Sequence, residues 1–378
     1  MSKFLSNYVL LLLALVGCSG CDTPNEAPQQ KEALFSGLSR YSSEPQSLSK
    51  DEQIAASKDT FANVTPGYEM TFPFDHNSHP NFAVEWWYIT ANLTDTQNNP
   101  YALQWTLFRF ASNTHTTPWA NTQQFMGHAG LRDGKQAWFE ERFARGGVGN
   151  AGISTAPFNA FIDDWRWLAQ SPKLFPSALE LTIDSDIKAN LDFTADKPFV
   201  KHGDQGFSRK LRDAKQASYY YSQPHIQVSG VLELPKGTVQ VTGNAWFDHE
   251  WTSQLVDSHT QGWDWFSMHF DDGAKLMLFN MRQQQSRDFW SGTLITQNGK
   301  HIALSEQDIQ GSVTQRTQVA GRLLPLYWSI QLPKHQIDIQ IAPMQIKQWN
   351  PSIFSYYEGG TVISGSHSGV GFIELTGY

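Results

Sequence analysis

The residues with the clearest potential for chemistry stand in one short run, Asp248-His249-Glu250, between Trp246 and Trp251. In an extended chain the two carboxylates share one face, and His249 shares the other face with Trp251. A His among rings can act as a general acid or base with a pKa shifted by desolvation, and either carboxylate can protonate or orient a substrate. The structural alternative is that these residues hydrogen-bond the backbone at a strand end or a domain junction.

A second polar group precedes three consecutive rings, Trp86-Trp87-Tyr88. His76, His79 and Glu85 have the residue types of metal ligands, but the nearby proline and polar residues indicate a loop and not a helix that presents two His on one face. We therefore expect no metal site. Glu85 begins the aromatic stretch, and we expect an acid in that position to form an ion pair with an Arg.

A third acid, Asp264, lies between Trp263 and Trp265. The chain then ends in a run rich in Gly and rings, 356–378, whose glycines allow a barrel corner or a close approach to a ligand. Within it, the sequence GSHSG has His367 at its centre and not Ser, which argues against an ordinary α/β serine hydrolase.

β-Strands must position these groups. Apolar and polar residues alternate strictly over 179–183 (LELTI) and 337–341 (IDIQI), as they do in strands with one buried face. Hairpin turn signals separate such runs at Asp133-Gly134, Lys236-Gly237, Asp272-Gly273 and Asn298-Gly299. No stretch after residue 60 has the pattern of a long amphipathic helix. The sequence predicts an all-β protein with antiparallel neighbours.

A weak internal repeat indicates two sheets or barrels. Residues 86–109 can be laid against 263–282, and each copy is an aromatic strand, a turn and an alternating strand that ends in Arg. Arg109 and Arg282 are therefore candidates for buried ion pairs with nearby acids. Chance similarity between two hairpins is the alternative. A true repeat places the start of the second half near residue 253.

Composition excludes several classes of protein. The chain has 378 residues and a net charge of −8, which does not suit a nucleic-acid-coating protein. It contains 14 Trp, 12 Tyr and 24 Phe with only 17% charged residues, so most of it is folded. These rings belong in a core, an interface or an apolar ligand site.

The first residues read as a targeting segment. Lys3 precedes an apolar run over 8–16, which has the length of a signal peptide and not of a membrane span. The sequence Leu15-Val16-Gly17-Cys18 resembles a lipobox, which predicts a signal peptide over 1–17, acylation of Cys18 and a polar tether over 18–66. The alternatives are an ordinary signal peptide or acylation of Cys21. Because these are the two cysteines of the chain, the globular part has no disulfide framework.

Taken together, five separated motifs resemble the AttH-like and carotenoid 1,2-hydratase (hydroxyneurosporene synthase, CrtC) family, over roughly residues 70 to 378. These motifs are Glu85-Trp86-Trp87-Tyr88, Ala245 to Trp251 (AWFDHEW), Gly262-Trp263-Asp264-Trp265, Tyr357-Glu358-Gly359 and Gly371 to Tyr378 (GFIELTGY). The resemblance implies two lipocalin-like β-barrels, which we assign to 67–252 and 253–378. It is closer to the AttH-like branch, often described as predicted secreted hydrolases, than to the carotenoid branch, which adds water to an alkene without a cofactor.

The expected function is binding of a hydrophobic small molecule of lipid or isoprenoid type, with hydration or hydrolysis of it and with no cofactor. The expected catalytic residues are Asp248, His249, Glu250, Trp251 and Asp264, and the expected ligand-binding residues are Trp86, Trp87, Tyr88, Trp246, Trp263 and Trp265. Ser19 after Cys18 favours the periplasmic face of a bacterial outer membrane. The alternative is a non-catalytic lipid carrier or an accessory protein of an ABC-type membrane transporter.

Overall fold

The computed structural model of the chain describes residues 61–112, 121–213, 215–256 and 259–378. Within them, nearly all regular structure is β, and the helical pieces are two short 3-10 turns, η1 (Phe74–His76) and η2 (Pro333–His335). None of the described helices is long and apolar enough to cross a membrane. The predicted all-β class is confirmed. Cys18, the signal peptide and most of the tether lie outside the described residues.

The first sheet contains 13 strands in the described part of the chain. They are β1 (Val84–Asp95), β2 (Pro100–Ala111), β3 (Gln123–Arg132), β4 (Ala137–Arg145), β5 (Ala151–Thr155), β6 (Phe158–Ile162), β7 (Trp165–Ala169), β8 (Ser177–Ile183), β9 (Ile187–Thr194), β10 (Val200–Lys201), β11 (Phe207–Arg209), β12 (Ala217–Leu234) and β13 (Gly237–Gln254). Their order is β4-β3-β2-β1-β13-β12-β9-β8-β7-β6-β5, with β10 and β11 paired to β12. This sheet is called the first barrel below.

The second sheet contains 10 strands in the same described residues. They are β14 (Thr260–Phe270), β15 (Lys275–Gln283), β16 (Phe289–Ile295), β17 (His301–Leu304), β18 (Gln310–Val319), β19 (Arg322–Leu332), β20 (Ile337–Pro343), β21 (Trp349–Asn350), β22 (Tyr356–Gly365) and β23 (Gly369–Leu375). Their order is β17-β16-β15-β14-β23-β22-β20-β19-β18, with β21 paired to β22. This sheet is called the second barrel.

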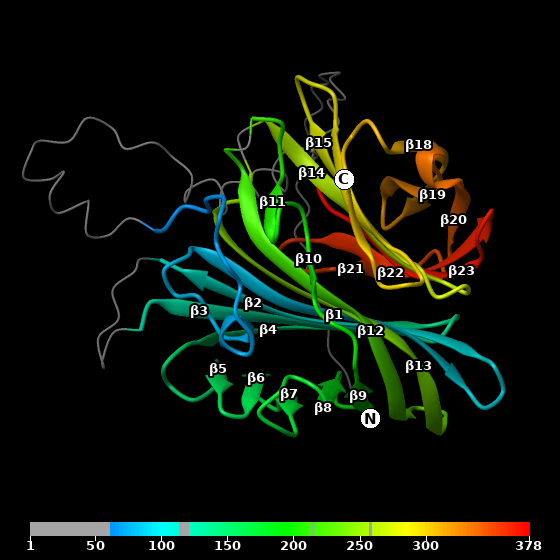
Figure 1. Cartoon of the computed structure of the whole chain (residues 1–378). Coiled ribbons are helices and arrows are strands. Elements are labelled where there is room, and N and C mark those ends of the chain that lie inside the picture. Colours follow the sequence, from blue (N-terminus) through cyan, green and yellow to red (C-terminus); the bar gives the residue numbers. More distant parts are fainter. Residues whose placement is uncertain (1–60, 113–120, 214, 257–258) are drawn as a thin grey trace, which may run out of the picture.

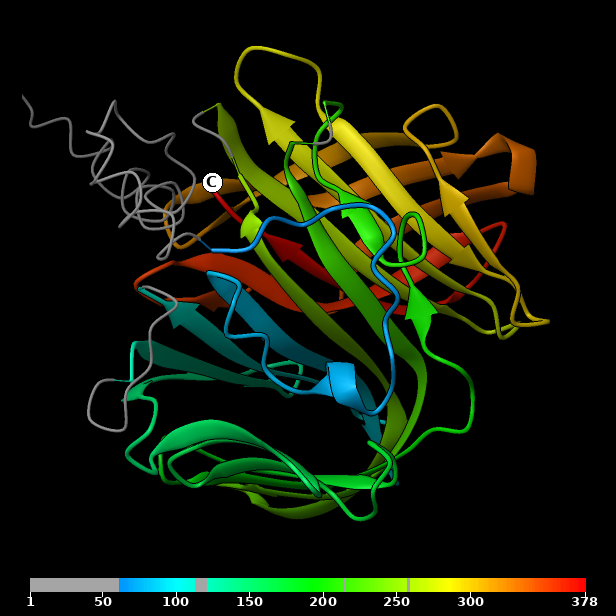
Figure 2. The same cartoon turned by 60° about the vertical axis from the view of Figure 1, so that its left-hand side comes forward.

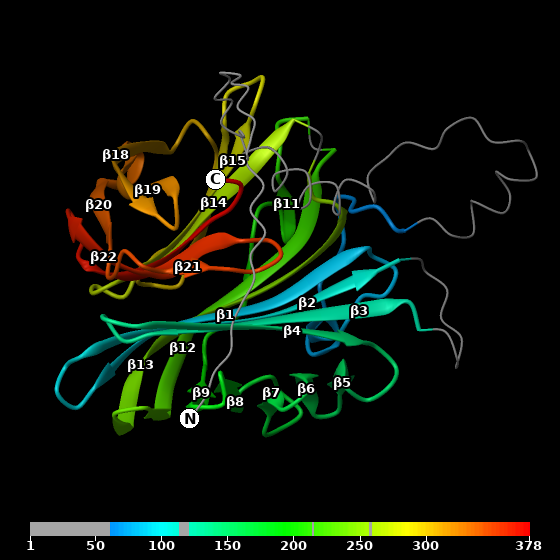
Figure 3. The ribbon, with the colours of Figure 1, turned by 180° about the vertical axis from the view of Figure 1, so that it is seen from behind.

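Both sheets are antiparallel and strongly curled, and they lie against each other (Figures 1 and 2). Seen from behind, the second barrel lies above β1 and β2 (Figure 3), and the two barrels meet where β22 contacts β2 and β23 contacts β1. One sheet nearly closes and the other forms a half-barrel, so the expected pair of lipocalin-like barrels is confirmed. Strands of the first barrel end at Gln254 and those of the second begin at Thr260. The domain boundary at residue 253 remains a prediction.

The two barrels have the same strand order. The run β4-β3-β2-β1-β13-β12-β9-β8-β7 of the first corresponds strand for strand to β17-β16-β15-β14-β23-β22-β20-β19-β18 of the second. The two hairpins that the sequence repeat joins, β1–β2 and β14–β15, therefore occupy equivalent places. Likewise, β10 lies beside β12 as β21 lies beside β22. Equivalent strands supply equivalent faces to the interface between the barrels.

Three apolar cores follow from strand alternation. One fills the first barrel, one fills the second, and a third lies between them, where Trp246, Trp265 and Phe279 are buried. Strand β13 separates the first core from the third, so every residue over 245–253 is buried. A strand covered on both faces loses the exposed half of its alternating pattern. Its two faces nevertheless meet different environments.

The segment before β1 also packs on the first barrel. Val64 and Met70 belong to its core, and η1 brings Asp75 and His76 against it (Figure 2). The indole of Trp87 donates to the carbonyl oxygen of His76 at 2.9 Å. We call residues 61–82 the strap, because they tie one end of this barrel.

Candidate active site

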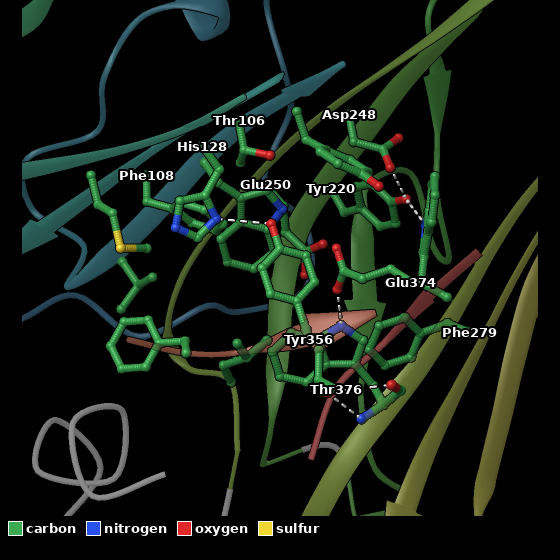
Figure 4. Close-up of a pocket in the computed structure, with 18 of the residues that line it drawn as sticks. Thr106, Phe108, His128, Tyr220, Asp248, Glu250, Phe279, Tyr356, Glu374 and Thr376 are labelled. Carbon is green, nitrogen blue, oxygen red and sulfur yellow. Dashed lines mark hydrogen bonds between the residues drawn. The ribbon is translucent and has the colours of Figure 1, made fainter. Parts of the chain in front are cut away.

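A cavity of about 100 Å³ lies between the barrels (Figure 4). It is lined mainly by rings and aliphatic side chains, with several acids among them. The residues that line it are Val84, Trp86, Tyr88, Thr106, Phe108, Phe110, Met126, His128, Tyr220, Asp248, Glu250 and Leu255 from the first barrel and its exit, and Trp263, Trp265, Phe279, Phe354, Tyr356, Glu374 and Thr376 from the second half. An apolar cavity with a few polar groups is the usual form of a small-molecule site.

Strand register brings the first acids into this cavity. Trp86 of β1 lies opposite Glu250 of β13, and Tyr88 lies opposite Asp248. These side chains share the outer face of the first barrel, because alternation sends their sequence neighbours inward. Predicted catalytic residues Asp248 and Glu250 and predicted ligand residues Trp86 and Tyr88 are therefore brought together.

Asp248 is 2% exposed and accepts three side-chain hydrogen bonds. Ser222 and the Trp246 indole donate to Oδ1, the latter at 2.7 Å, and the Tyr220 hydroxyl donates to Oδ2 at 2.8 Å. Burial raises the pKa of Asp248 to about 7, although these donors favour the carboxylate. At neutral pH a large share of Asp248 carries a proton that it can donate. Trp246 thus supports Asp248 from outside the cavity lining.

Glu250 has a different environment from Asp248. Its Oε1 forms an ion pair with Nζ of Lys210 at 2.6 Å, and both side chains are buried. The ammonium of Lys210 also lies 4.9 Å and 4.4 Å from the ring centres of Tyr220 and Phe279. The ion pair and the two ring faces hold this ammonium beside the Glu250 carboxylate. Two acids two residues apart thus have different partners: hydroxyl and indole donors surround Asp248, and an ammonium lies against Glu250.

The second barrel supplies two further acids. Glu374 of β23 lies opposite Glu358 of β22, and Glu374 accepts from the Trp263 indole at 2.5 Å. Burial, with a smaller effect of Glu250, raises the pKa of Glu374 to about 7. Burial and then Glu374 raise the pKa of Glu358 well above its ordinary value, while Tyr88 donates to its carboxylate. The interface between the barrels therefore holds three buried acids, Asp248, Glu358 and Glu374, whose pKa values burial raises.

Tyr356 enters the cavity from β22, where its hydroxyl meets His128 (Figure 4). Its hydroxyl lies 2.8 Å from Nδ1 of His128, and Nε2 of His128 lies 2.9 Å from Oε2 of Glu141. Since Glu141 only accepts when ionised, His128 donates through Nε2 and accepts from the phenol through Nδ1. Burial lowers the pKa of His128, which keeps the ring neutral and able to accept.

The two walls of the cavity are built alike. In the first barrel Tyr88 lies opposite Asp248, and in the second Trp265 lies opposite Glu374. Tyr220 of β12 and Tyr356 of β22 occupy equivalent strands and both line the cavity. The two acids with a pKa near 7 thus come from equivalent strands of the two barrels.

Three predicted residues of this region lie on the other face. Trp87, His249 and Trp251 point into the first barrel and do not line the cavity. His249 is fully buried, with Nε2 2.9 Å from Glu85 Oε1 and Nδ1 3.0 Å from the Tyr221 hydroxyl. Strand alternation is the reason, because His249 cannot share a face with the acids beside it.

Around His249 the polar groups form one closed network with the strap. Glu85 also contacts His79 Nδ1 at 2.6 Å and Arg109 Nε at 2.7 Å, so the expected Arg partner is present. Burial alone would raise the pKa of Glu85, but His79 and Arg109 lower it. Burial lowers the pKa of His249 to about 4, so this imidazole is neutral.

Ligand atoms of His79, Glu85 and His249 lie within 4.8 Å of one another, the separation that a metal ion requires. Their chemistry nevertheless favours the hydrogen-bonded network. His79 bridges Glu85 and Asp75, and Arg109 already neutralises Glu85. A divalent cation would have to displace the proton of His79 while facing the Arg109 guanidinium.

Asp264 also lies away from the cavity, inside the second barrel. It contacts Arg282 Nε at 3.3 Å, Asn280 Nδ2 at 2.9 Å and the Tyr378 hydroxyl at 2.7 Å. Its neighbours Trp263 and Trp265 point the other way and line the cavity. Asp264 and Arg282 thus form an acid–Arg pair in the second barrel, as Glu85 and Arg109 do in the first, although the two acids stand at different places on their strands.

Sequence reasoning missed several residues of the cavity. The most important are Tyr220, His128, Tyr356 and Glu374, together with Lys210, which pairs with Glu250 behind the lining. Two of these have a signal in the sequence, since Glu374 and Tyr356 lie in or beside the aromatic motifs at the C-terminal end. Tyr220 is the middle of three consecutive tyrosines, 219–221, a run of rings that could have drawn attention to it. His128 and Lys210 stand in stretches with no distinctive spacing.

Comparisons with known proteins agree with this fold. A family model described as AttH-like matches residues 63–378. The crystal structure of an AttH protein from Nitrosomonas europaea is similar at 30% identity and a TM-score of 0.77, covering 84% of this chain and 99% of that one. A search of the curated proteins finds no match.

Two more distant crystal structures share the fold. Kievitone hydratase from Nectria haematococca has 13% identity and a TM-score of 0.62, with 84% of this chain and 96% of that chain covered. CghA with Sch210972 has 11% identity and a TM-score of 0.51, with 79% and 88% covered. At these identities the likeness concerns the fold alone.

Proposed function

The chain belongs to the AttH-like family, and on that premise we propose that it adds water to an apolar, unsaturated small molecule held between its two barrels. One observation carries the proposal. Asp248 and Glu374 have pKa values raised to about 7 and line a cavity made mostly of rings. A carboxylic acid that stays protonated at neutral pH is the group that proton transfer to a carbon–carbon double bond requires.

The reaction has two steps. The proton of the Asp248 carboxyl moves to one alkene carbon, which uses the π electron pair to form a C–H bond and leaves the second carbon positive. Water attacks that carbon, and the Glu250 carboxylate takes the proton that water loses. The product is an alcohol, with Asp248 ionised and Glu250 protonated. The reverse sequence eliminates water from an alcohol.

The rings of the cavity have a role in the first step. The cationic carbon lies among Trp86, Trp263 and Phe279, whose faces attract positive charge. Such an interaction contributes about 2 kcal/mol when both groups are desolvated. The same rings exclude bulk water, which leaves a single ordered water as the nucleophile.

We favour hydration over hydrolysis. Among the described residues that line the cavity there is no Ser or Cys that could form an acyl intermediate. Protonated acids and aromatic faces instead suit a carbocation. The fold shared with kievitone hydratase is compatible with this proposal, since the activity in that protein's name is of the same class.

The test uses geraniol and farnesol as probes in ¹⁸O-labelled water, with mass spectrometry of the products. We expect gain of one labelled water by the wild-type protein. In Asp248→Asn, turnover falls by about 10² to 10⁴, because the amide cannot donate the proton. Asn244→Ser, on the same strand but outside the cavity, is the matched control and retains turnover. Equal turnover in Asp248→Asn and wild type would rule out Asp248 as the acid.

A carrier without turnover is the second candidate, favoured by the apolar lining that binding alone also requires. In that case both probes bind, measured by quenching of tryptophan fluorescence, and no label enters the product in any variant. The proposed location for either function is the periplasmic face of the outer membrane, with Cys18 acylated. A transporter partner belongs to the carrier proposal.

A further inference from the structure

His202 connects the acid of the cavity to a groove between residues 203–212 of the first barrel and β15 to β17 of the second. We propose that Thr293, His202 and Ser222 form a proton relay that reloads Asp248 from water in this groove. The inference rests on the proposed function, because Asp248 needs reloading only if it gives up its proton in turnover. The relay residues act only through Asp248 and do not touch the substrate.

The relay is an unbroken line of side-chain hydrogen bonds. Nδ1 of His202 lies 2.8 Å from the Thr293 hydroxyl, and Nε2 lies 2.6 Å from the Ser222 hydroxyl. Ser222 in turn donates to Oδ1 of Asp248. Thr293, His202 and Ser222 are at most 2% exposed, so bulk water does not interrupt the line.

All hydrogen bonds of the line can point toward Asp248. Ser222 donates to the carboxylate, so its oxygen accepts from Nε2–H of His202, and Nδ1 accepts from the Thr293 hydroxyl. Burial, together with Lys210 and His301, holds the pKa of His202 well below its ordinary value. The imidazole is thus neutral, with one nitrogen that donates and one that accepts. This polarity suits transfer of a proton in the direction of Asp248.

The far end of the line faces a groove of about 1030 Å³. Thr293 lines it together with Ser291, Gly203 and Asp204. Asp204 is exposed and stands two residues after His202. The groove and the cavity are lined by different residues, so protons can enter at Thr293 while the cavity holds an apolar substrate.

Comparison of the two barrels singles out this line. Asn350 of β21 occupies the place of His202. Asn350 pairs with Tyr356 of β22, and in the same way the backbone N–H of His202 donates to the carbonyl oxygen of Tyr220 of β12. Asn350 donates to Glu358 at 3.2 Å, as His202 contacts Ser222. An amide holds its neighbours in place but does not pass protons. The first barrel alone has a proton-transferring group at this position.

The protons balance over one turnover, and the line is reset when the hydroxyls of Thr293 and Ser222 rotate and the His202 ring turns over to bring its N–H back toward Ser222. A groove water gives one proton to the Thr293 oxygen as the Thr293 proton moves to Nδ1. The proton on Nε2 moves to Ser222, and the Ser222 proton moves to Asp248. One proton therefore enters from the groove, and the proton that Glu250 took from the attacking water leaves on the cavity side with product exchange.

The test measures proton exchange at Asp248 and needs no substrate. The protein is mixed rapidly into D₂O at a pH one unit below 7, where Asp248 is mostly protonated. The isotope shift of its carboxyl C=O band is followed by infrared spectroscopy, and Asp248→Asn identifies the band by its loss. His202→Gln keeps a donor toward Ser222 and an acceptor toward Thr293 but cannot relay. We expect about tenfold slower exchange or more in this variant.

Three further variants make the result decisive. Thr293→Val removes the entry hydroxyl and slows exchange, whereas Thr293→Ser restores it. Asn350→Gln, at the equivalent place in the second barrel, leaves the rate unchanged. If His202→Gln fails to fold, the Thr293 pair decides. Exchange as fast in His202→Gln and Thr293→Val as in wild type overturns the relay.

The two proposals fail separately. If neither probe takes up labelled water, the hydratase proposal falls, while the exchange rates still decide whether Asp248 is reached from the groove. If labelled water is incorporated and the exchange rates do not differ between variants, the relay falls and hydration stands.

Discussion

The raised pKa of Asp248 has a consequence for stability that can be measured without knowing the substrate. In the unfolded chain this carboxyl titrates near its ordinary value of 3.8, and in the folded protein it titrates near 7. Between these pH values the folded state binds more protons than the unfolded state. The free energy of unfolding therefore falls as pH rises, by about 1.4 kcal/mol per pH unit.

The perturbation is Asp248→Asn, which removes the ionisation and keeps the size of the side chain. Over the interval from 3.8 to 7 the cost of ionising buried Asp248 accumulates to about 4 kcal/mol. The variant does not bear this cost. The free energy of unfolding of the variant, relative to that of wild type, therefore rises by about 4 kcal/mol as the pH rises from 3.8 to 7. Any change in hydrogen bonding to Ser222, Trp246 and Tyr220 adds an offset that is the same at every pH.

The assay is urea unfolding followed by tryptophan fluorescence, repeated at several values between about pH 4 and pH 8. The quantity of interest is the difference in free energy of unfolding between variant and wild type. It rises with pH and levels off above the folded pKa. Asn244→Ser, which changes no ionisable group on the same strand, gives a difference independent of pH. A flat difference for Asp248→Asn would refute the raised pKa and with it the basis for a neutral acid in the cavity.

The remaining predictions concern the first barrel and the N-terminal segment. Arg109→Met leaves the Glu85 carboxylate buried without the Arg109 guanidinium. It also removes the hydrogen bonds that this guanidinium donates to Gln123 and to the carbonyl oxygens of His79 and Phe82, so we expect the free energy of unfolding in urea to fall by about 3 to 5 kcal/mol. A fall below about 1 kcal/mol would contradict the central place of this pair. Cells grown with labelled palmitate incorporate label into the wild-type protein and not into Cys18→Ser, and label that persists in the variant would move the acylation site to another residue.

The sequence predicts which side chains of β13 share a face, but not which of its two faces lines the cavity. Alternation separates Asp248 and Glu250 from His249 and Trp251, and the structure has this separation. Sequence patterns could not tell which face meets a ligand, because β13 is buried on both sides and so lacks the polar face that marks solvent. His249 is consequently a core histidine tied to Glu85 and Tyr221.

The rest of the site depends on contacts across the two barrels. His128 and Tyr356 meet at the cavity only because β22 contacts β2 and β23 contacts β1. Periodicity reports the neighbours of one strand and carries no information on which sheet will cover it. Asp264 shows the same limit, since Trp263 and Trp265 face the cavity while the acid between them points into the second barrel.

The shared strand order of the two barrels has a consequence for how such a site can change. Two separate identical chains in a twofold dimer would present the same residue on both walls, so every substitution would appear twice. Here both barrels belong to one chain, so equivalent positions can carry different residues. His202 of the first barrel contacts Ser222, and Asn350 at the equivalent place in the second barrel contacts Glu358. Because the two barrels are joined in one chain, a substitution changes only one wall of the cavity. One wall can therefore be modified for the reaction while the other keeps the two barrels in contact.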